Sequence, residues 1–458
     1  MPRMRHIGVM ELFGSSGVRG IVGASMGPEL VVTIAQAAGT VWDADRAVLG
    51  RDTRPSGQML AAAAASGLAS VGVDVVDVGV TPTPNVVRLA EAWAIPGLII
   101  TASHNPARFN GVKLVGAAGR ELSVDALERV EACIDHDTAR PADHATVGQI
   151  TTRTGVNEAY IAAVRQAVDA EAIAAAELHV VIDPGDGAGS LTTPQLFRSL
   201  GCEVTTVNAT TDGTFPARPP EPVPQHLAVL QETVRAADAD LGIAHDGDAD
   251  RAVFVDETGH PIAGEASLAA LAAAELDAGA TMVAAIDSSQ RLVDVVEEAG
   301  ARLELTPIGA SHLITAIERL QAAGAAIPIA GEGNGGVFFP PYRVVRDGAY
   351  TAARFAALLA ETSASAVVAP HQGYHTARAN ITVGDDRERA RIQARADRYL
   401  RRRGGAITDI DGTRVDLDEG WILVRPSGTE PLVRIVAEAA SAATATAYVE
   451  ETEQAVVP

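Results

Sequence analysis

The chain has 458 residues, which at about 150 residues per domain predicts two to four domains. A formal net charge of −22 and an aromatic share of 4% exclude a basic nucleic-acid surface and a platform of base-stacking rings. The hydrophobic share of 47% provides for large buried cores and excludes a disordered or fibrous chain.

The basic residues are unusual, because Lys113 is the only lysine among the 36 Lys and Arg residues. An acidic, alanine-rich surface with little lysine suits high salt, so we expect a halophilic source; a GC-rich coding bias is the alternative explanation. Under either explanation, a lysine kept at this one position needs a reason at that position.

The two cysteines, Cys133 and Cys202, are too few for a disulfide framework and have no metal-binding spacing around them. Glu11 precedes any long apolar run, so we expect no secretory signal, and no charge-free apolar stretch reaches the length of a membrane span. These features predict a cytoplasmic protein, monomer or homodimer, without nucleic-acid or membrane partners.

Short apolar runs alternate with alanine-rich helical stretches, the pattern of βαβ units. Strands are predicted, in chain order, at 47–50, 73–76, 97–100, 179–182, 241–244 and 281–286. Asp52, Asp183 and Asp287 each follow such a strand, which suggests three related α/β domains with mixed, mostly parallel sheets. An aspartate in this place is also an ordinary helix N-cap.

The last 90 or so residues change character. Strands at 371–381, 414–416 and 421–424 surround an arginine-rich helix at 386–403, which predicts a smaller α+β C-terminal domain. The predicted domains are residues 1–150, 151–251, 252–366 and 367–458.

The first loop that carries chemistry, Thr101–Pro106, follows the strand at 97–100. Ser103 lies there between small residues and a proline-fixed turn, which suits a nucleophile or phosphoryl acceptor. A plain turn is the alternative interpretation. Lys113, ten residues on, could supply positive charge, or exchange a proton if its pKa is depressed.

The second loop, His245–Arg251, carries carboxylates at alternate positions, Asp246, Asp248 and Asp250. Three such carboxylates can converge on one hard divalent cation, and we predict a magnesium site. An EF-hand would need glycine where Arg251 stands. An acidic surface turn is the remaining alternative.

The third loop, Gly331–Gly336, matches the dinucleotide pattern G-x-G-x-x-G, but Val337–Pro341 follows and cannot open a helix. An acid and an amide on a bare glycine loop could instead bind sugar hydroxyls, with a simple hairpin as the alternative. The fourth loop, Arg425–Pro431, with Arg434 close behind, gathers arginine, two hydroxyls and a glycine N–H into a predicted phosphate cradle.

Together with Phe13–Gly20 near the N-terminus, these loops resemble the α-D-phosphohexomutase superfamily, which includes phosphoglucomutase/phosphomannomutase and phosphoglucosamine mutase. Five motifs in matching order cover essentially the whole chain. The resemblance implies four domains around a central cleft. It also implies an isomerase that interconverts hexose 6-phosphate and hexose 1-phosphate, with phosphosugars as its small-molecule partners.

The resemblance also implies the site residues. Ser103 would be the phosphoserine, and Mg²⁺ would be held by Asp246, Asp248, Asp250 and an oxygen of that phosphoserine. Lys113 would be the general acid/base, with Arg19, His104 and Arg251 around the reacting centre. The substrate-binding residues would be Glu332, Asn334, Gly335, Thr306, Gly309, Arg425, Ser427, Gly428, Thr429 and Arg434.

The implied cycle passes through a hexose 1,6-bisphosphate, which also serves as activator, and returns the other phosphate to Ser103. Asn334 and Gly336 stand where bacterial members usually carry Ser and His, so the sugar loop looks archaeal. The cradle resembles that of phosphoglucosamine mutases, and Ala310 stands where some relatives place a histidine. We expect glucosamine phosphate as substrate, with phosphomannomutase/phosphoglucomutase as the alternative and a sugar phosphatase or phosphosugar sensor as a remote one.

Overall fold

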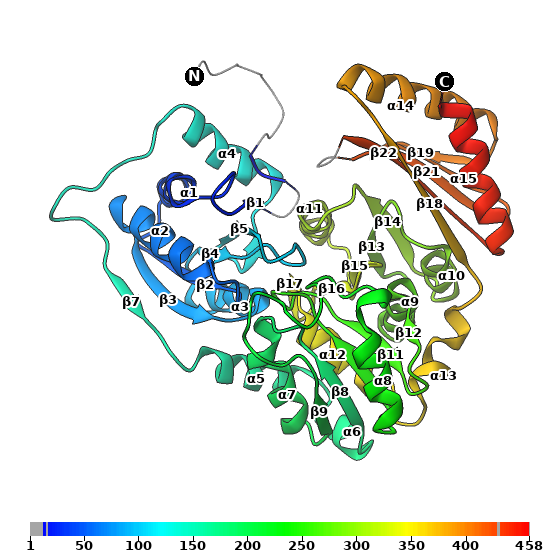
Figure 1. Ribbon diagram of the computed structural model, residues 1–458, viewed down its shortest axis with the longest axis horizontal. Coiled ribbons are helices and arrows are strands. Elements are labelled where there is room, and N and C mark those ends of the chain that lie inside the picture. The colour runs from blue at the N-terminus through cyan, green and yellow to red at the C-terminus, as the bar shows by residue number, and fades with distance from the viewer. Residues whose placement is uncertain (1–11, 15–16, 428–430, 458) are drawn as a thin grey trace.

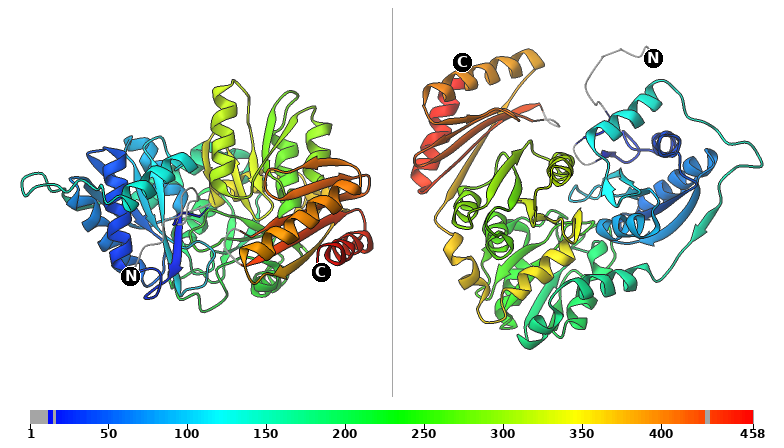
Figure 2. Two further views of the ribbon diagram at one scale, coloured as in Figure 1. Left: turned by 90° about the horizontal axis from the view of Figure 1, so that it is seen from above. Right: turned by 180° about the vertical axis from the view of Figure 1, so that it is seen from behind.

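The computed structural model describes residues 12–14, 17–427 and 431–457. It contains four β-sheets, each formed by a separate stretch of the chain. In Figure 1 they form an arc that runs from the N-terminal domain, in blue, to the C-terminal domain, in red. The two further views of Figure 2 likewise place the first and fourth domains at opposite ends of the arc. The predicted architecture of three α/β domains and a smaller C-terminal domain is confirmed.

The first sheet is mixed, with strand order β1-β5-β4-β2-β3-β7, and β6 pairs with β5. Strands β4, β2, β3 and β7 are parallel, and β1 and β5 are antiparallel to their neighbours. The elements are β1 (Val18–Ile21), α1 (Pro28–Trp42), β2 (Arg46–Arg51), α2 (Gly57–Ser70), β3 (Asp74–Val80), α3 (Thr83–Trp93), β4 (Gly97–Ile100), β5 (Phe109–Gly116), β6 (Arg120–Glu121), α4 (Val124–Asp135) and β7 (Ile150–Thr152).

The second sheet has the order β12-β11-β10-β8-β9. The elements are α5 (Val156–Ala167), α6 (Ala170–Ala175), β8 (His179–Asp183), η1 (Ala188–Leu191), α7 (Thr193–Ser199), β9 (Glu203–Thr206), η2 (Pro224–His226), α8 (Ala228–Ala236), β10 (Leu241–Ala244), β11 (Val253–Asp256) and β12 (Pro261–Ile262). After β10 the chain turns back, and β11 pairs antiparallel with β10. The domain division predicted after residue 251 therefore falls inside this sheet.

The third sheet has the order β14-β13-β15-β16-β17. The elements are α9 (Gly264–Glu275), β13 (Thr281–Ala285), α10 (Gln290–Glu298), β14 (Arg302–Thr306), α11 (Ala310–Ala322), β15 (Ala330–Glu332), β16 (Gly336–Phe339), β17 (Arg343–Arg346), α12 (Gly348–Ala357), α13 (Ala364–Val368) and η3 (Ala369–His371). Strands β14, β13 and β15 are parallel, as expected for βαβ units, and β16 and β17 return antiparallel.

The fourth sheet is antiparallel throughout, in the order β18-β22-β21-β20-β19. The elements are β18 (His375–Thr382), α14 (Asp386–Arg402), β19 (Ala406–Thr408), β20 (Thr413–Leu417), β21 (Gly420–Pro426), β22 (Leu432–Ala439) and α15 (Ala442–Val456). The first predicted strand of this domain begins at His375 rather than at residue 371, because η3 occupies 369–371. Within the described residues, no helix has the length and apolar character needed to cross a bilayer.

Buried side chains join the domains. One continuous core includes Ile243 and Phe254 of the second sheet together with Met282 and Phe355 of the third domain, so these two domains share their packing. The fourth domain has its own core and contacts the third through a small cluster in which Trp421 packs against Ile286. Because the cluster between them is small, we expect the fourth domain to move relative to the third.

A buried hydrogen bond crosses between the second and third domains, and we expect its loss to destabilise the protein. The Tyr160 hydroxyl of α5 donates to Asp347 Oδ1 over 2.5 Å, and both side chains are buried. Tyr160→Phe should lower the free energy of unfolding by about 1–3 kcal/mol, because the Asp347 carboxylate loses a donor that water does not replace.

Chemical or thermal denaturation would measure the change, and Tyr342→Phe is the matched control. The Tyr342 ring stacks on Tyr350, but its buried hydroxyl makes no hydrogen bond within the described part of the chain. Tyr342→Phe should therefore be neutral or slightly stabilising. Equal losses in the two variants would contradict the assignment to the Asp347 hydrogen bond.

Candidate active site

The first of the predicted loops, Thr101–Pro106, is called the serine loop below. It lies between β4 and β5, and Ser103 is fully buried in it. Ser103 has φ of 49°, in the left-handed region that residues other than glycine seldom adopt. Its backbone N–H donates to Thr101 Oγ1 over 2.9 Å, which helps to fix the turn. The loop thus presents its hydroxyl in a defined direction at the carboxyl end of a buried strand, where α/β active sites gather.

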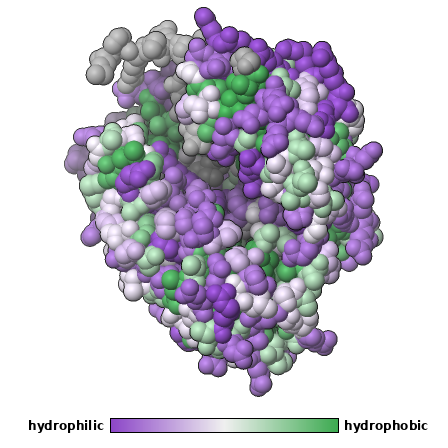
Figure 3. Space-filling view, turned by 45° about the vertical axis from the view of Figure 1, so that its right-hand side comes forward, coloured by the Kyte–Doolittle hydropathy of each residue, from purple (hydrophilic) through white to green (hydrophobic). Residues whose placement is uncertain are grey.

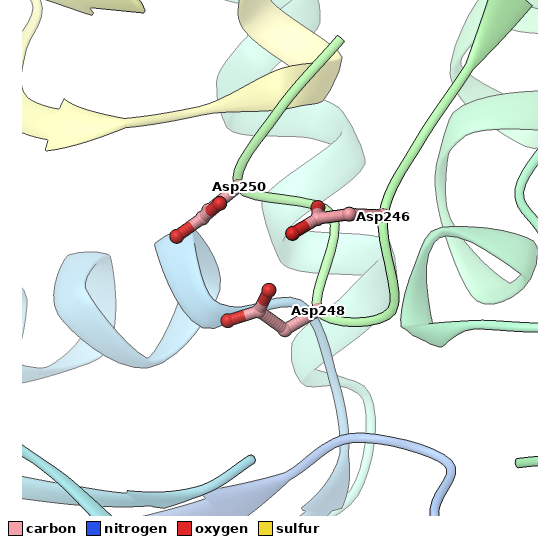
Figure 4. A group of neighbouring side chains, drawn as sticks. All are labelled: Asp246, Asp248 and Asp250. Carbon is pink, nitrogen blue, oxygen red and sulfur yellow. The ribbon is translucent and has the colours of Figure 1, made fainter. Parts of the chain in front are cut away.

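The second predicted loop, His245–Arg251, is called the metal loop below and connects β10 to β11. It brings together the side chains of Asp246, Asp248 and Asp250, as Figure 4 shows. All three are buried, and one carboxylate oxygen of each lies within 4.8 Å of the others. The three carboxylates therefore converge, as predicted, because they come from alternate positions of one tight loop.

The two loops meet directly, although they are more than 140 residues apart in the chain. The Ser103 hydroxyl donates to Asp246 Oδ2 over 2.6 Å. Lys113 of β5 reaches the same site, and its Nζ lies 2.9 Å from Asp248 Oδ2 and 3.0 Å from Asp250 Oδ2. The nucleophile candidate, the lone lysine and the metal-ligand candidates therefore form one buried cluster.

The pKa of Lys113 is raised, whereas the proton exchange considered from the sequence would need a depressed pKa. Burial favours the neutral amine, but the attraction of Asp248, Asp250 and Glu121 outweighs it and raises the pKa of Lys113. The lysine is therefore held as an ammonium group that neutralises the carboxylates.

The pKa values of the neighbouring carboxyl groups are shifted in opposite directions. Burial acts to raise the pKa of Asp248, but Lys113 and the Thr83 hydroxyl stabilise the ionised form and lower it overall. Burial and repulsion from its two neighbours raise the pKa of Asp246. A charge distribution of this kind favours a further cation beside Asp246.

The carboxylate oxygens of this cluster fit a divalent metal ion. Asp248 Oδ1 and Asp250 Oδ1 are buried and make no hydrogen bond within the described residues, whereas their Oδ2 atoms are paired. A buried carboxylate oxygen without a donor is costly unless a cation meets it. Hard oxygen ligands of this type suit Mg²⁺, so Asp246, Asp248 and Asp250 could hold it.

The other predicted catalytic residues lie at the same place. Arg19 of β1 donates from Nη1 to Asn105 Oδ1 over 2.8 Å, and Arg251 Nε lies 3.9 Å from Asp250 Oδ1. His104 Nδ1 is 3.4 Å from the Ser103 hydroxyl. Burial, together with Arg251 and Arg19, lowers the pKa of His104 to about 2, so the imidazole is neutral at physiological pH.

The predicted sugar loop joins β15 to β16 as a hairpin, in which Gly335 has φ of 87°. Glu332 is buried, and Asn334 is exposed and accepts a hydrogen bond from the Gly336 N–H over 3.0 Å. Arg346 connects this loop to the metal loop, since its guanidinium lies 3.5 Å from Glu332 and 2.7 Å from Asp250.

The third domain also holds Thr306 and Gly309, both buried, at the end of β14 and the start of α11. The Thr306 hydroxyl donates to the Pro307 carbonyl over 2.9 Å. This segment touches the fourth domain, because the Ile308 N–H donates to Asp411 Oδ2 over 3.1 Å.

The predicted phosphate cradle lies at the turn between β21 and β22. Arg425 and Arg434 are paired residues on these neighbouring strands, and Ser427 follows at the end of β21. Arg425 forms an ion pair with Asp411 at 3.0 Å. Gly428 and Thr429 lie outside the described residues, as do Ser15 and Ser16 of the N-terminal motif.

The space-filling view of Figure 3 shows a hollow near the centre of one face, with mostly hydrophilic residues around it. This agrees with the central cleft that the resemblance implies.

Sequence reasoning missed several residues of the site. Arg346 pairs with Asp250, Thr83 donates to Asp248 Oδ2 over 2.6 Å, and Arg54 holds the serine loop. Arg346 and Thr83 belong to no polar motif, so the sequence offered no signal for them. Arg54 had one, because Asp52, which binds it, stands out as an aspartate after a strand.

Comparison with known proteins identifies the class. The chain matches all four domains of phosphoglucomutase/phosphomannomutase: α/β/α domain I at residues 10–141, domain II at 158–259, domain III at 262–373 and the C-terminal domain at 379–455. The chain therefore belongs to the phosphoglucomutase/phosphomannomutase family of the α-D-phosphohexomutase superfamily. It is a phosphohexomutase, an isomerase that acts as an intramolecular phosphotransferase.

Individual relatives agree with this class. A Thermococcus kodakarensis phosphoglucomutase/phosphomannomutase is 40% identical and covers 96% of this chain and 97% of its own length. A probable phosphoglucosamine mutase of Methanococcoides burtonii is 37% identical over 94% of this chain and 95% of its own. A solved family structure from Burkholderia thailandensis is 27% identical, with a TM-score of 0.83 over 97% of this chain and 96% of its own.

Proposed function

We propose that this phosphohexomutase works through a phosphoserine at Ser103 and a hexose 1,6-bisphosphate intermediate, with glucosamine phosphate as its preferred substrate. The observation that carries the mechanism is the contact between the Ser103 hydroxyl and Asp246 at 2.6 Å, inside a buried cluster of three carboxylates and one lysine. Such a cluster supplies the positioning and charge neutralisation that phosphoryl transfer requires.

In each half-reaction the bond between phosphorus and the Ser103 oxygen breaks as a bond to a sugar oxygen forms, or the reverse. The sugar hydroxyl gives up its proton when it attacks, and the serine oxygen takes one up when it leaves. Mg²⁺, bound by Asp246, Asp248 and Asp250, would draw charge from the phosphoryl oxygens. Arg19 and Arg251 would bind those oxygens, and the proton exchange assigned to Lys113 would start from its ammonium form.

Return of the second phosphate needs the sugar to present both ends to Ser103 in turn. Glu332 and Asn334 would bind the hydroxyls of the sugar, and Arg425, Ser427 and Arg434 would hold whichever phosphate is distant from the serine. The cradle stands on the fourth domain, which has a separate core, so it can move to meet either orientation.

The preference for the amino sugar is supported by relatives and by the cradle sequence. Several archaeal relatives that cover more than 90% of this chain are named probable phosphoglucosamine mutases. The T. kodakarensis relative is named for glucose and mannose, so these sugars define the alternative.

The test is ³¹P NMR of the protein with Mg²⁺ and a sugar bisphosphate primer, in low and high KCl. Glucosamine 6-phosphate, glucose 1-phosphate and mannose 1-phosphate are supplied in separate samples. We expect interconversion of the 1- and 6-phosphates, fastest with the amino sugar. Faster conversion of glucose or mannose phosphate would contradict the preference, and release of inorganic phosphate alone would identify a phosphatase.

A further inference from the structure

Arg54, between β2 and α2, directs its whole guanidinium group at the serine loop and at one aspartate. The residue is 2% exposed, and Nε donates to Asp52 Oδ2 over 3.0 Å. The two Nη atoms donate to four backbone carbonyls of the serine loop and the start of β5: Ser103 at 2.7 Å, Asn105 at 2.6 Å, Pro106 at 2.8 Å and Phe109 at 3.0 Å. No donor is left for a ligand, so Arg54 acts on the loop and not on the substrate.

We propose that Arg54, oriented by Asp52, is a positioning residue that sets the Ser103 hydroxyl against the metal-ligand carboxylates. The inference rests on the proposed phosphoserine at Ser103. Arg54 touches no reacting atom, so its effect on the reaction passes through the backbone of the loop.

The conformation of Ser103 shows why such a clamp is needed. A φ of 49° is unfavourable for serine and persists only where neighbouring contacts impose it. The Ser103 carbonyl is held by Arg54, and its N–H by the Thr101 hydroxyl, which in turn donates to Asp52 Oδ2 over 2.7 Å. Asp52 is therefore linked, through Arg54 and through Thr101, to the carbonyl and to the N–H of Ser103.

The metal loop fits closely against the same carbonyl. A side chain at Gly247 would place its Cβ 2.7 Å from the Ser103 oxygen, so the two loops touch through their backbones. The Arg54 guanidinium also stacks over the Phe215 ring of the second domain, 5.0 Å from its centroid. Movement of the Ser103 carbonyl would therefore change the hydroxyl's distance from Asp246, which lies beside Gly247.

The second domain contains a similar Asp–Arg pair, which holds the metal loop. Arg218 is buried, pairs with Asp183 at 2.9 Å and donates to the His245 carbonyl over 2.7 Å, one residue before Asp246. Asp52 directly follows β2, and Asp183 is the last residue of β8. Two strand-end Asp–Arg pairs thus hold the serine and the metal loop from opposite domains.

The experiment follows phosphorylation of Ser103 by glucose 1,6-bisphosphate and Mg²⁺, using intact-protein mass spectrometry over time. Arg54→Lys keeps the positive charge, but one ammonium group cannot reach the acceptors that the guanidinium fork serves. We expect the same final fraction of phosphorylated protein as in the wild type, with a rate constant about 10–100-fold lower. A purely structural role would instead lower the reacting fraction and leave the rate constant of the folded molecules unchanged.

Two more variants complete the test. Thr101→Val removes the hydroxyl that links Ser103 to Asp52 and should also slow the phosphorylation, so it carries the test if Arg54→Lys fails to fold. Arg165→Lys, an exposed arginine with one carbonyl contact at 3.0 Å, is the control and should react as the wild type does.

A wild-type rate constant in both Arg54→Lys and Thr101→Val would overturn the positioning role. A wild-type protein that takes up no phosphate on Ser103 would refute the proposed function itself, and this inference with it.

Discussion

Replacing Ser103 by alanine is expected to abolish mutase turnover while leaving phosphosugar binding intact. The hydroxyl is the phosphoryl carrier in the proposed cycle, so its loss should lower kcat by about 10³-fold or more. The residues proposed to bind the sugar and its distant phosphate belong to the third and fourth domains. The dissociation constant for a hexose phosphate, measured by calorimetry, should therefore change by no more than about threefold.

Ser66→Ala is the matched control for this prediction, because Ser66 lies exposed on α2 and, among the described residues, its hydroxyl donates to the Ala62 carbonyl alone. It should retain full activity. Turnover retained in Ser103→Ala would break the phosphoserine assignment. Loss of both turnover and binding would show that the serine loop shapes the substrate site instead of carrying the phosphate.

Local patterns in the sequence are enough to predict two buried strands and the two loops that follow them. The apolar runs at 97–100 and 241–244 are buried strands, and the polar loops that follow them are the serine loop and the metal loop. A run of four apolar residues bounded by turn signals is typical of a strand buried on both faces, and each of these two strands pairs with a parallel strand on one side and an antiparallel strand on the other. The convergence of Asp246, Asp248 and Asp250 could be predicted because the three stand at alternate positions of one short loop.

Contacts made between distant segments could not be predicted in this way. Arg346 reaches Asp250 from 96 residues away, and Thr83 reaches Asp248 from 165 residues away. Such contacts depend on how whole domains dock, which no local pattern records. The raised pKa of Lys113 has the same origin, since it results from three carboxylates that only the folded chain places around the amine.

Removal of divalent metal is expected to stop turnover, and addition of Mg²⁺ is expected to restore it. The buried Asp248 Oδ1 and Asp250 Oδ1 atoms accept no hydrogen bond in the described structure, and Arg251 Nε stays 3.9 Å from Asp250 Oδ1, so both oxygens are available to bind a cation. Binding of a cation by the native state alone also stabilises that state, by about 2.7 kcal/mol at a hundred times the dissociation constant. Mg²⁺ should therefore raise the unfolding temperature as well as the rate.

Asp248→Asn separates these effects from nonspecific salt. The amide keeps the shape of the side chain but removes one charge from the metal-ligand set, so kcat should fall by about 100-fold and the rise in unfolding temperature with Mg²⁺ should largely disappear. Asp143→Asn is the control, because Asp143 is an exposed aspartate whose carboxylate, within the described part of the chain, binds only its own turn, and it should behave as the wild type. Full turnover after chelation would refute a metal site at Asp246, Asp248 and Asp250. An equal Mg²⁺ response in Asp248→Asn and the wild type would place the stabilising ion elsewhere, because a site built on three carboxylates cannot lose one without losing affinity.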